Sequence, residues 1–346
     1  MKKIKIGSLE INSHVYIPPM AGVTDLAFRK MVRLFDKETL IATEMVSSKA
    51  LMFNPSQSLM KLSPDEHPVG IQLFGHEPDV MAKAAILAEA QGADFIDINM
   101  GCPAPKITKG KDGAALMREP DLAFEITKAV IGSVRIPVTV KMRLGWDDCQ
   151  KNAPDLAGKL EQAGVCAFTV HGRTREQGYT GNADWNAITN VKRSVSVPVF
   201  GNGDVRSPYD ALKLLEITSC DGVAIARAIM GSPWLSMQIN QFLETGSFSS
   251  EPSDIEKLDL ALKHLDELIK VKGEIIGIRE GRRHLINYTK GMINAAQVRA
   301  QIGQINTKEE AEKLISDLKE ELTKKVRKIY LIKNEEMTEF NLISSK

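Results

Sequence analysis

The sequence of 346 residues contains few cysteines and no long hydrophobic run. Four cysteines, none of them in a Cys-x-x-Cys pair, do not form a disulfide framework and argue against a structural zinc site, so we expect no bound metal. No stretch reaches about 18 uninterrupted apolar residues, so we expect no bilayer-spanning helix. No apolar segment follows the amino-terminal lysines, as it would in a signal peptide. These absences predict a cytoplasmic protein with reduced thiols.

The sequence also has no excess of either charge. Lys and Arg number 45 and Asp and Glu number 44, which gives a net charge of +1. This balance argues against proteins that bind nucleic acid through bulk positive charge, but it leaves a local basic patch open. Hydrophobic residues make up 43% and charged residues 26%, which are ordinary globular values. At about 150 residues per domain, the length predicts two domains.

The first two thirds of the chain alternate short β-branched runs with helical patterns, which is typical of a parallel sheet with crossover helices. We expect eight strands, at Val15–Ile17, Leu40–Thr43, Val69–Phe74, Phe95–Asn99, Val138–Met142, Phe168–His171, Val197–Asn202 and Gly222–Ala226. We expect helices at Thr24–Leu34, Val46–Phe53, Pro78–Gln91, Pro120–Ile131, Pro154–Ala163, Trp185–Ser194 and Pro208–Glu216. Eight such units in about 245 residues predict an α/β fold, a (β/α)8 TIM barrel, rather than an open sheet.

The pattern changes from Glu251 onward, where leucines recur at helical spacing and β-branched runs fade. Further helices are expected over Arg279–Met292 and Lys308–Ile332. The polar segment Glu244–Asp254 contains Gly and Pro and is typical of a linker. We therefore expect a barrel domain over residues 1–245 and an all-helical C-terminal domain over residues 246–346.

Polar or turn-forming residues follow nearly every expected strand, at the end where a TIM barrel builds its active site. They are Pro18–Asp25, Gln72, Asn99–Pro103, Lys141, Arg143, His171–Thr174, Gly201–Asp204 and Ala226–Arg227. A single Lys or His at such a position is often a satisfied structural group. Convergence of so many loops is harder to explain by packing, and the longest of them, Gly101–Glu119, is the first candidate for the active site.

The last two barrel loops have the composition of a phosphate site. In barrels these loops often bind phosphate together with a helix start, and here they contain Asn202–Asp204, Ala226 and Arg227. Glycine lets backbone N–H groups approach an anion closely, and an arginine can bind it. Lys141 and His171 are expected to face the same mouth, where a cation would stabilise an anionic reduced flavin. Alternatively, Lys141 is a solvated surface lysine, although the apolar strand around it argues against that.

Cys102 follows a glycine at the carboxyl end of an expected strand. A buried, inert thiol is the commonest fate of a cysteine. At the head of the longest loop, however, a thiol can supply or remove a proton. Cys166 and Cys220 fall in a strand start and a turn, and Cys149 falls in a polar loop, so Cys102 is the candidate catalytic residue.

Five segments together resemble the tRNA-dihydrouridine synthases, most closely the bacterial B-type branch. They are Pro19–Asp25 (PMAGVTD), Asp97–Pro103 (DINMGCP), Lys141–Trp146 (KMRLGW), His171–Thr174 (HGRT) and Gly201–Asp204 (GNGD). Single motifs are shared with other flavin barrels, whereas the combination is specific. The resemblance spans the whole chain, although the helical domain is similar mainly in length and pattern.

The resemblance implies FMN at the barrel mouth, reduced by NADPH or NADH. A hydride would pass to C6 of a tRNA uridine while Cys102 protonates C5 from the opposite face. The implied FMN contacts are Pro19, Met20, Ala21, Gln72, Lys141, His171, Asn202, Gly203, Asp204, Ala226 and Arg227. Asn99 and Arg143 would orient the uracil. The family usually has glycine where this chain has Ala226, and the added methyl group predicts weaker phosphate binding.

Positive residues cluster in the expected helical domain and in the long loop. Seven lie between residues 270 and 299, opposed there by Glu274 and Glu280: Lys270, Lys272, Arg279, Arg282, Arg283, Lys290 and Arg299. Others are Lys324, Lys325, Arg327 and Lys328, and Lys106, Lys109, Lys111 and Arg118. Such runs are usually solvated faces, but here they lie where a tRNA would have to touch. We expect Arg282 and Arg283 to bind tRNA, and we expect neither a membrane nor an obligate protein partner.

Two other functions remain open from the sequence. A dihydroorotate-dehydrogenase-like FMN oxidoreductase would act on a free pyrimidine, but it would not need the helical domain. A non-catalytic RNA-binding protein on a barrel would not need Cys102, Lys141 and His171 together. The sequence does not indicate which tRNA uridine is reduced.

Overall fold

Eight parallel strands close into a barrel in the order β10-β3-β4-β5-β6-β7-β8-β9, which confirms the predicted TIM barrel. The structure is a computed structural model that describes residues 2–55, 58–292 and 294–324. The strands are β3 (Val15–Ile17), β4 (Leu40–Ser47), β5 (Val69–Phe74), β6 (Phe95–Met100), β7 (Val138–Arg143), β8 (Ala167–His171), β9 (Val199–Asn202) and β10 (Gly222–Ala224).

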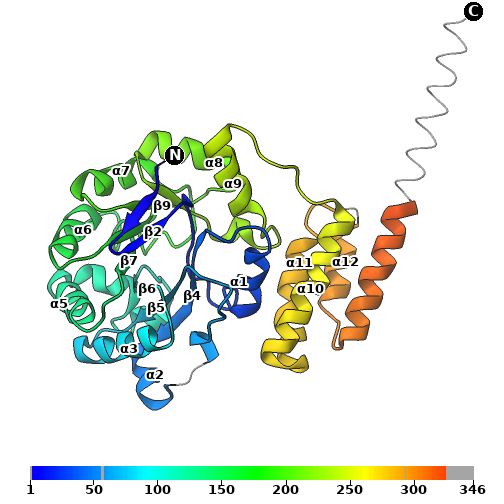
Figure 1. Ribbon diagram of the computed structural model, residues 1–346, viewed down its shortest axis with the longest axis horizontal. Helices are drawn as coiled ribbons and strands as arrows, with labels where there is room; N and C mark the ends of the chain where they lie inside the picture. Colours follow the sequence, from blue (N-terminus) through cyan, green and yellow to red (C-terminus); the bar gives the residue numbers. More distant parts are fainter. Residues whose placement is uncertain (1, 56–57, 293, 325–346) are drawn as a thin grey trace, which may run out of the picture. The chain divides into compact units, whose positions relative to one another are not determined.

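Helices follow the strands and surround the barrel (Figure 1). They are α1 (Leu26–Arg33), α2 (Ser48–Phe53), α3 (Pro78–Ala90), α5 (Pro120–Ile131), α6 (Ala153–Gln162), α7 (Trp185–Ser194), α8 (Pro208–Thr218) and α9 (Leu235–Thr245). The long loop after β6 carries the short helix α4 (Pro105–Thr108) and the 3-10 helix η2 (Gly113–Arg118). Prolines occupy the first turn of α3, α5, α6 and α8, where the missing N–H has no intrahelical partner.

Some expected boundaries were wrong. β4 continues to Ser47 because it pairs with β5 as far as Ser47 and Phe74, so Val46 belongs to the strand. Helix α2 begins only after Ser47, whose side chain accepts a hydrogen bond from the Ala50 N–H. β10 ends at Ala224, where its pairing with β3 and β9 ends.

The elements that were not expected from the sequence include α9 and an amino-terminal hairpin of β1 (Ile4–Ile6) and β2 (Leu9–Ile11). The hairpin packs at the amino ends of the barrel strands. Its isoleucines share a buried cluster with Tyr16, Phe95 and Phe200, and the Tyr16 ring lies edge-on 6.2 Å from Phe95 and 5.9 Å from Phe200. The barrel is therefore closed with apolar side chains at this end.

Alternation along the strands separates an apolar layer from a polar interior. Ile96, Ile98 and Met100 of β6 belong to the buried apolar core that includes residues of the surrounding helices. The intervening Asp97 and Asn99 lie on the opposite face of the strand, inside the barrel. β7 and β8 follow the same period, with Thr139, Lys141, Arg143, Thr169 and His171 alternating with core residues.

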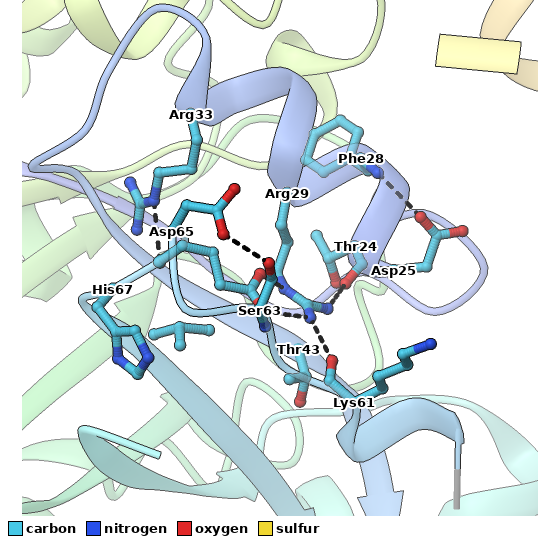
Figure 2. Close-up of polar contacts among 12 residues, drawn as sticks. Thr24, Asp25, Phe28, Arg29, Arg33, Thr43, Lys61, Ser63, Asp65 and His67 are labelled. Atoms are coloured by element: carbon cyan, nitrogen blue, oxygen red, sulfur yellow. Dashed lines mark hydrogen bonds and ion pairs between the residues drawn. The ribbon is translucent and has the colours of Figure 1, made fainter. Parts of the chain in front are cut away.

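A buried network of charged groups fixes the start of β5 to helix α1 (Figure 2). Arg29 donates to both carboxylate oxygens of Glu66, at 2.6 and 3.1 Å, and to the carbonyls of Thr24 and Lys61. Arg33, further along α1, donates to the carbonyls of Glu66 and Pro68. A buried ion pair is tolerated when its remaining donors are satisfied, so these buried charges are structural.

The chain divides into two compact units, the first running to Ile229 and resuming from Pro233 to Ser249. The second comprises Met230–Ser232 and the chain from Ser250 onward. Its helices are α10 (Asp254–Lys272), α11 (Glu274–Tyr288), α12 (Ala295–Ile302) and a helix over residues 308–324. The expected helix over Arg279–Met292 had the wrong bounds, because α11 begins five residues earlier and ends at Tyr288. The expected helix over Lys308–Ile332 is present from residue 308 to residue 324, and its remaining residues lie outside the described residues.

Glycines allow the first two helices of this second unit to pack closely. A Cβ atom on Gly277 would lie 2.8 Å from the Ile269 Cα, and one on Gly281 would lie 2.4 Å from the Leu265 Cδ1. Because backbone atoms cannot yield as a side chain can, Gly277 sets the separation of α10 and α11. Among the described residues, no helix is both long and apolar enough to span a membrane.

Candidate functional site

Buried amide and carboxylate side chains form a hydrogen-bonded chain inside the barrel, between the neighbouring strands β5 and β6. Gln72 donates to the Asp97 Oδ2 at 2.6 Å, and its own Oε1 accepts from the Asn99 Nδ2 at 2.7 Å. Thr139 of β7 donates to the Asp97 Oδ1 at 2.7 Å. Burial raises the pKa of Asp97, although the hydrogen bonds from Thr139 and Gln72 and the charge of Lys141 oppose the shift. The network fixes the amide of Asn99.

Asn99 in turn fixes the backbone at Cys102. Its Oδ1 accepts from the N–H groups of Gly101 and Cys102, at 3.1 and 2.9 Å. The Cys102 carbonyl accepts from the Ala114 N–H at 3.1 Å, and Arg143 of β7 donates to the Gly101 carbonyl at 2.8 Å. Cys102 thus sits on a rigid strand end with a partly exposed side chain. This is the arrangement that a proton donor to a bound substrate requires.

Lys141 and His171 lie at the same end of the barrel, where β7 and β8 pair Arg143 with His171. Burial lowers the Lys141 pKa to about 8, helped by the charge of Arg143 and opposed by Asp97. Burial and the charges of Lys141, Arg143, Arg173 and Arg227 lower the His171 pKa to about 2. His171 is therefore neutral at physiological pH, while Lys141 remains largely charged.

Arg173 determines the tautomer of His171. The sequence placed Arg173 in a loop at the barrel mouth but suggested no role for it. It is almost fully buried, and its Nη1 lies 3.3 Å from the His171 Nε2. Arginine can only donate, so Nε2 accepts and the ring proton resides on Nδ1, which is left as a donor. Arg173 also donates to the Asp204 Oδ2 at 2.7 Å and to the carbonyls of Thr180 and Gly181.

Tyr179 is a further candidate that the sequence did not reveal. Its ring lies 5.5 Å from the Arg143 guanidinium carbon, 4.8 Å from that of Arg227 and 6.2 Å from the His171 ring. The side chain is 58% exposed, in the loop after β8. Arg143 is buried, donates to the carbonyls of Thr174 and Gly178, and has its pKa lowered by burial to about 10. The only sequence signal for Tyr179 is an aromatic residue shortly after the His171 motif.

Residues 202–204 form a tight backbone cradle after β9. Gly203 has a φ of +123°, and a Cβ atom there would lie 2.6 Å from the Ala183 Cβ. Asn202 donates to the Ala224 carbonyl at 2.7 Å, which links β9 to β10. Asp204 accepts from the Ala183 N–H at 2.7 Å; burial alone would raise its pKa, but this bond and Arg173 outweigh burial and lower it.

The expected phosphate residues after β10 lie beside this cradle. The Arg227 guanidinium is 3.8 Å from the Asp204 Oδ1, and the Arg227 side chain is 57% exposed. Ala226 is half-buried and does not adopt a positive φ, so a side chain there causes no backbone strain. The backbone at position 226 therefore does not require glycine. The methyl group of Ala226 still lies next to Arg227 in the chain, so the predicted weaker phosphate binding stays a prediction.

Pro19, Met20 and Ala21 form the turn after β3, at the same end of the barrel. The Met20 carbonyl accepts from the N–H groups of Val23 and Thr24, at 2.9 and 3.0 Å. The Gly22 N–H donates to Glu44 of β4, which anchors the turn to the neighbouring strand. All three residues are at least partly exposed.

The helical unit uses several of its positive side chains internally. Arg282 donates twice to the Ile305 carbonyl, at 2.9 and 2.6 Å, and once to the Asn306 Oδ1 at 3.0 Å. Lys270 pairs with Glu267 at 2.7 Å and Lys272 with Glu280. Arg283 is exposed. Among the described residues, no acid pairs with Arg279, Lys290 or Arg299, so their charges remain available to a partner.

Two groups of expected basic residues have different outcomes. Lys106, Lys109, Lys111 and Arg118 are all exposed in the loop that carries Cys102. Lys325, Arg327 and Lys328 lie outside the described residues. Within the described part of the chain, no group of three or more His, Cys, Asp or Glu residues is placed to hold a metal ion.

Residues 16–326 match the family described as dihydrouridine synthase (Dus). The chain belongs to the dihydrouridine synthase family. A protein of Rickettsia bellii named probable tRNA-dihydrouridine synthase is 45% identical over 306 residues, which cover 88% of this chain and 94% of that protein. The tRNA-dihydrouridine synthase B of Pseudomonas aeruginosa is 39% identical over 307 residues, 88% of this chain and 92% of that protein. The resemblance seen in the motifs, and the expectation of an enzyme, are confirmed.

Solved structures with low sequence identity share the fold of this chain. The histamine dehydrogenase of Rhizobium sp. 4-9 has a TM-score of 0.53 at 13% identity and covers 77% of this chain. A 2-naphthoyl-CoA reductase in complex with 2-naphthoyl-CoA has a TM-score of 0.54 at 11% identity and covers 69%. The chain spans about half the length of each, 50% and 51%. These likenesses concern the barrel fold alone.

Proposed function

We propose that this protein reduces specific uridines of tRNA to 5,6-dihydrouridine, with FMN as cofactor and NADPH or NADH as reductant. The observation that carries the proposal is the position of Cys102, held through Asn99 and Arg143 at the barrel end that also bears Lys141 and His171. The names of the relatives from Rickettsia bellii and Pseudomonas aeruginosa support tRNA as the substrate. We place this activity in the cytoplasm.

The residues present fit FMN. Gly203 is required by its φ of +123° and by the close packing of Ala183 against it, and the backbone N–H groups of this turn would bind the phosphate. Among the described residues, no group accepts a hydrogen bond from the Lys141 ammonium, and the buried Asp204 Oδ1 receives none. Asn202, Gly203 and Asp204, with Ala226 and Arg227, would hold the ribityl chain and the phosphate.

The other proposed FMN contacts lie around the flavin ring. Pro19, Met20 and Ala21 would line it, while Gln72, Lys141 and His171 would contact its polar edge. Lys141, charged below pH 8, and the Nδ1 donor of His171 match the acceptors along such an edge. Bound FMN would supply the hydride that uracil C6 receives.

The chain itself supplies orientation and a proton. Arg143 uses three N–H groups on the carbonyls of Gly101, Thr174 and Gly178, which leaves its second amino group to orient a uracil carbonyl. Asn99 holds the loop that bears the thiol and, with Arg143, would orient the uracil. Cys102 donates its proton to C5, and because its side chain is partly exposed, water can return a proton to the thiolate afterwards. A base taken out of the RNA stack would be needed to reach this depth.

We further propose that the chain from about residue 246 binds the tRNA and that residues 1–245 bind FMN. Exposed Arg283 and Arg279, with Lys290, would contact phosphates. Arg282 remains a predicted tRNA contact, although its guanidinium already donates to Ile305 and Asn306. The exposed lysines beside Cys102 would contact RNA close to the reacting base.

The test is to map dihydrouridine in tRNA from cells that lack and then regain this gene, together with the flavin content of the purified protein. We expect one or more dihydrouridine positions to disappear and return, and a yellow protein that releases FMN. A colourless protein that cannot be reconstituted would overturn the cofactor assignment. Unchanged tRNA, with reduction of a free pyrimidine such as orotate instead, would overturn the substrate.

A further inference from the structure

A histidine–aspartate pair joins two neighbouring loops at the reactive end of the barrel. His76, in the loop after β5, places its Nδ1 2.8 Å from the Oδ1 of Asp112, in the loop after β6. The side chains are 34% and 16% exposed, so the contact is shielded without being buried. His76 also lies 3.9 Å, through its Nε2, from the Glu77 carboxylate.

Asp112 stands at the start of the helix that contacts Cys102. It precedes η2, but its carboxylate makes no capping bond to that helix and is therefore available to His76. The next residue, Gly113, has a φ of +60°, and a Cβ there would lie 2.9 Å from the Cys102 carbonyl oxygen. The residue after that, Ala114, donates to the same oxygen at 3.1 Å.

The far end of η2 is held separately. Asn152, in the loop after β7, donates to the Met117 carbonyl at 2.7 Å, and the Arg118 guanidinium carbon lies 4.9 Å from the centre of the Trp146 ring. The β7 side therefore fixes the end of η2, while His76 fixes its start from the β5 side. The start is the part that contacts Cys102.

We propose that His76 and Asp112 form a clasp that positions the Cys102 thiol by holding the start of η2 against the Cys102 carbonyl. Both are positioning residues, because neither needs to touch the substrate. This inference rests on the proposed role of Cys102 as proton donor, but the placement of the thiol can be measured without any turnover.

The chain contains a matched control pair. His67 and Asp94 make the same contact, Nδ1 to Oδ2 at 2.7 Å, with side chains 41% and 27% exposed. They precede β5 and β6, at the amino ends of the same two strands, far along the barrel from Cys102. Loss of this pair removes a similar interaction without touching the loop that bears the thiol.

The experiment measures the rate at which iodoacetamide alkylates Cys102 in the full-length protein, resolved by peptide mass spectrometry. Without the clasp, the start of η2 moves away more often, so His76→Ala is expected to react about fivefold faster than the unaltered protein. His76→Asn, whose amide nitrogen takes the place of Nδ1, is expected to restore the original rate. His67→Ala is expected to leave it unchanged.

Asp112→Asn and the double variant His76→Ala/Asp112→Ala complete the test. If the pair acts as a unit, the double variant reacts no faster than either single variant. Equal rates for His76→Ala and the unaltered protein, or equal acceleration by His67→Ala, would overturn the clasp. If His76→Ala does not fold, the alkylation rate of Cys102 in Asp112→Asn is compared with the rates in the unaltered protein and in His67→Ala, and faster alkylation in Asp112→Asn alone supports the clasp.

Turnover gives a second readout. For the His76→Ala protein we expect kcat for dihydrouridine formation to fall by about the same fivefold, with the KM for tRNA and the rate of NADPH oxidation unchanged. Should no variant form dihydrouridine at all, the proposed function fails, while the alkylation rates still decide whether the clasp exists.

Discussion

The barrel and the helical unit both bury histidines, but they surround them differently. His171 of the barrel has Lys141, Arg143, Arg173 and Arg227 around it, all at the strand ends where the loops converge. His264 of α10 stacks against His284 of α11 at 4.1 Å, and its Nδ1 lies 3.4 Å from the Tyr288 hydroxyl. Burial lowers both pKa values.

The two units differ in where they place hydrogen-bond donors that are not used within the protein. In the barrel, the Lys141 ammonium and the Nδ1 of His171 remain as donors at one end of the strands. In the helical unit, polar groups such as Arg282 are used to hold the helices and loops of that unit together. A perturbed pKa by itself therefore does not indicate a reactive site, whereas convergence of several donors does. The barrel holds its chemistry inside, and the helical unit offers its charge only at the surface.

The largest expected effect is in the barrel. Cys102→Ala removes the proton donor, so we expect dihydrouridine formation to fall by about 10²- to 10⁴-fold. Flavin content and NADPH oxidation should remain, because Cys102 does not hold the phosphate cradle or Lys141. The measurement is single-turnover dihydrouridine yield on unmodified tRNA beside NADPH oxidation. An unchanged yield would refute the proposed role of Cys102.

A smaller effect separates two adjacent arginines of the helical unit. Arg282→Ala removes three hydrogen bonds to Ile305 and Asn306 and should lower the free energy of unfolding of this unit by about 2 kcal/mol, roughly 30-fold in the equilibrium. Differential scanning calorimetry measures the change. Arg283→Ala should weaken tRNA binding a few-fold, with the salt slope reduced by about 1.

These two variants also test the comparison itself. If Arg282→Ala binds tRNA more weakly at full stability, Arg282 contacts tRNA as the sequence predicts, and the contrast with the barrel fails for this side chain. If Arg283→Ala leaves the salt slope unchanged, the surface around Arg283 is not the RNA contact.

The smallest expected effect is a pH dependence of FMN binding set by Lys141. The Lys141 pKa is about 8 in the protein without FMN, and an anionic ligand beside it would raise that value. Binding above pH 8 must then take up a proton, so the affinity for FMN falls as pH rises from 8, by at most tenfold per pH unit. Below pH 8 Lys141 is already charged and the affinity should be flat.

Quenching of FMN fluorescence by the flavin-free protein between pH 7 and 9.5 measures this slope. Lys141→Met should bind more weakly at pH 7 and lose the dependence above pH 8. A slope that persists in Lys141→Met would assign the proton to another group.

Much of the barrel could be predicted because each element leaves a local signal. Prolines mark the first turns of α3, α5, α6 and α8, and the alternation in Asp97-Ile98-Asn99 separates core from interior. The site residues could be proposed because parallel strands bring their carboxyl ends together, wherever those residues lie in the chain. The motifs then suggested roles for each of them.

The rest depends on contacts between distant segments. Tyr179 lies in an exposed loop, and nothing in its neighbours indicates that its ring meets Arg143 and Arg227. The hairpin strands are three residues each and become recognisable only through the aromatic cluster they cover. Charge counts could not show that Arg282 donates to Ile305, because a sequence does not reveal whether a guanidinium serves its own chain or a partner.

The amino-terminal hairpin has a consequence for how the protein is made. Ile4, Ile6 and Ile11 are synthesised long before Phe200 and Ala224, yet they share one buried cluster with them. Contacts so distant in sequence form late and slow folding. The cluster that covers the hairpin is therefore completed only when Phe200 and Ala224 have been synthesised, although Tyr16, Leu40, Ala42 and Phe95 precede them in the chain.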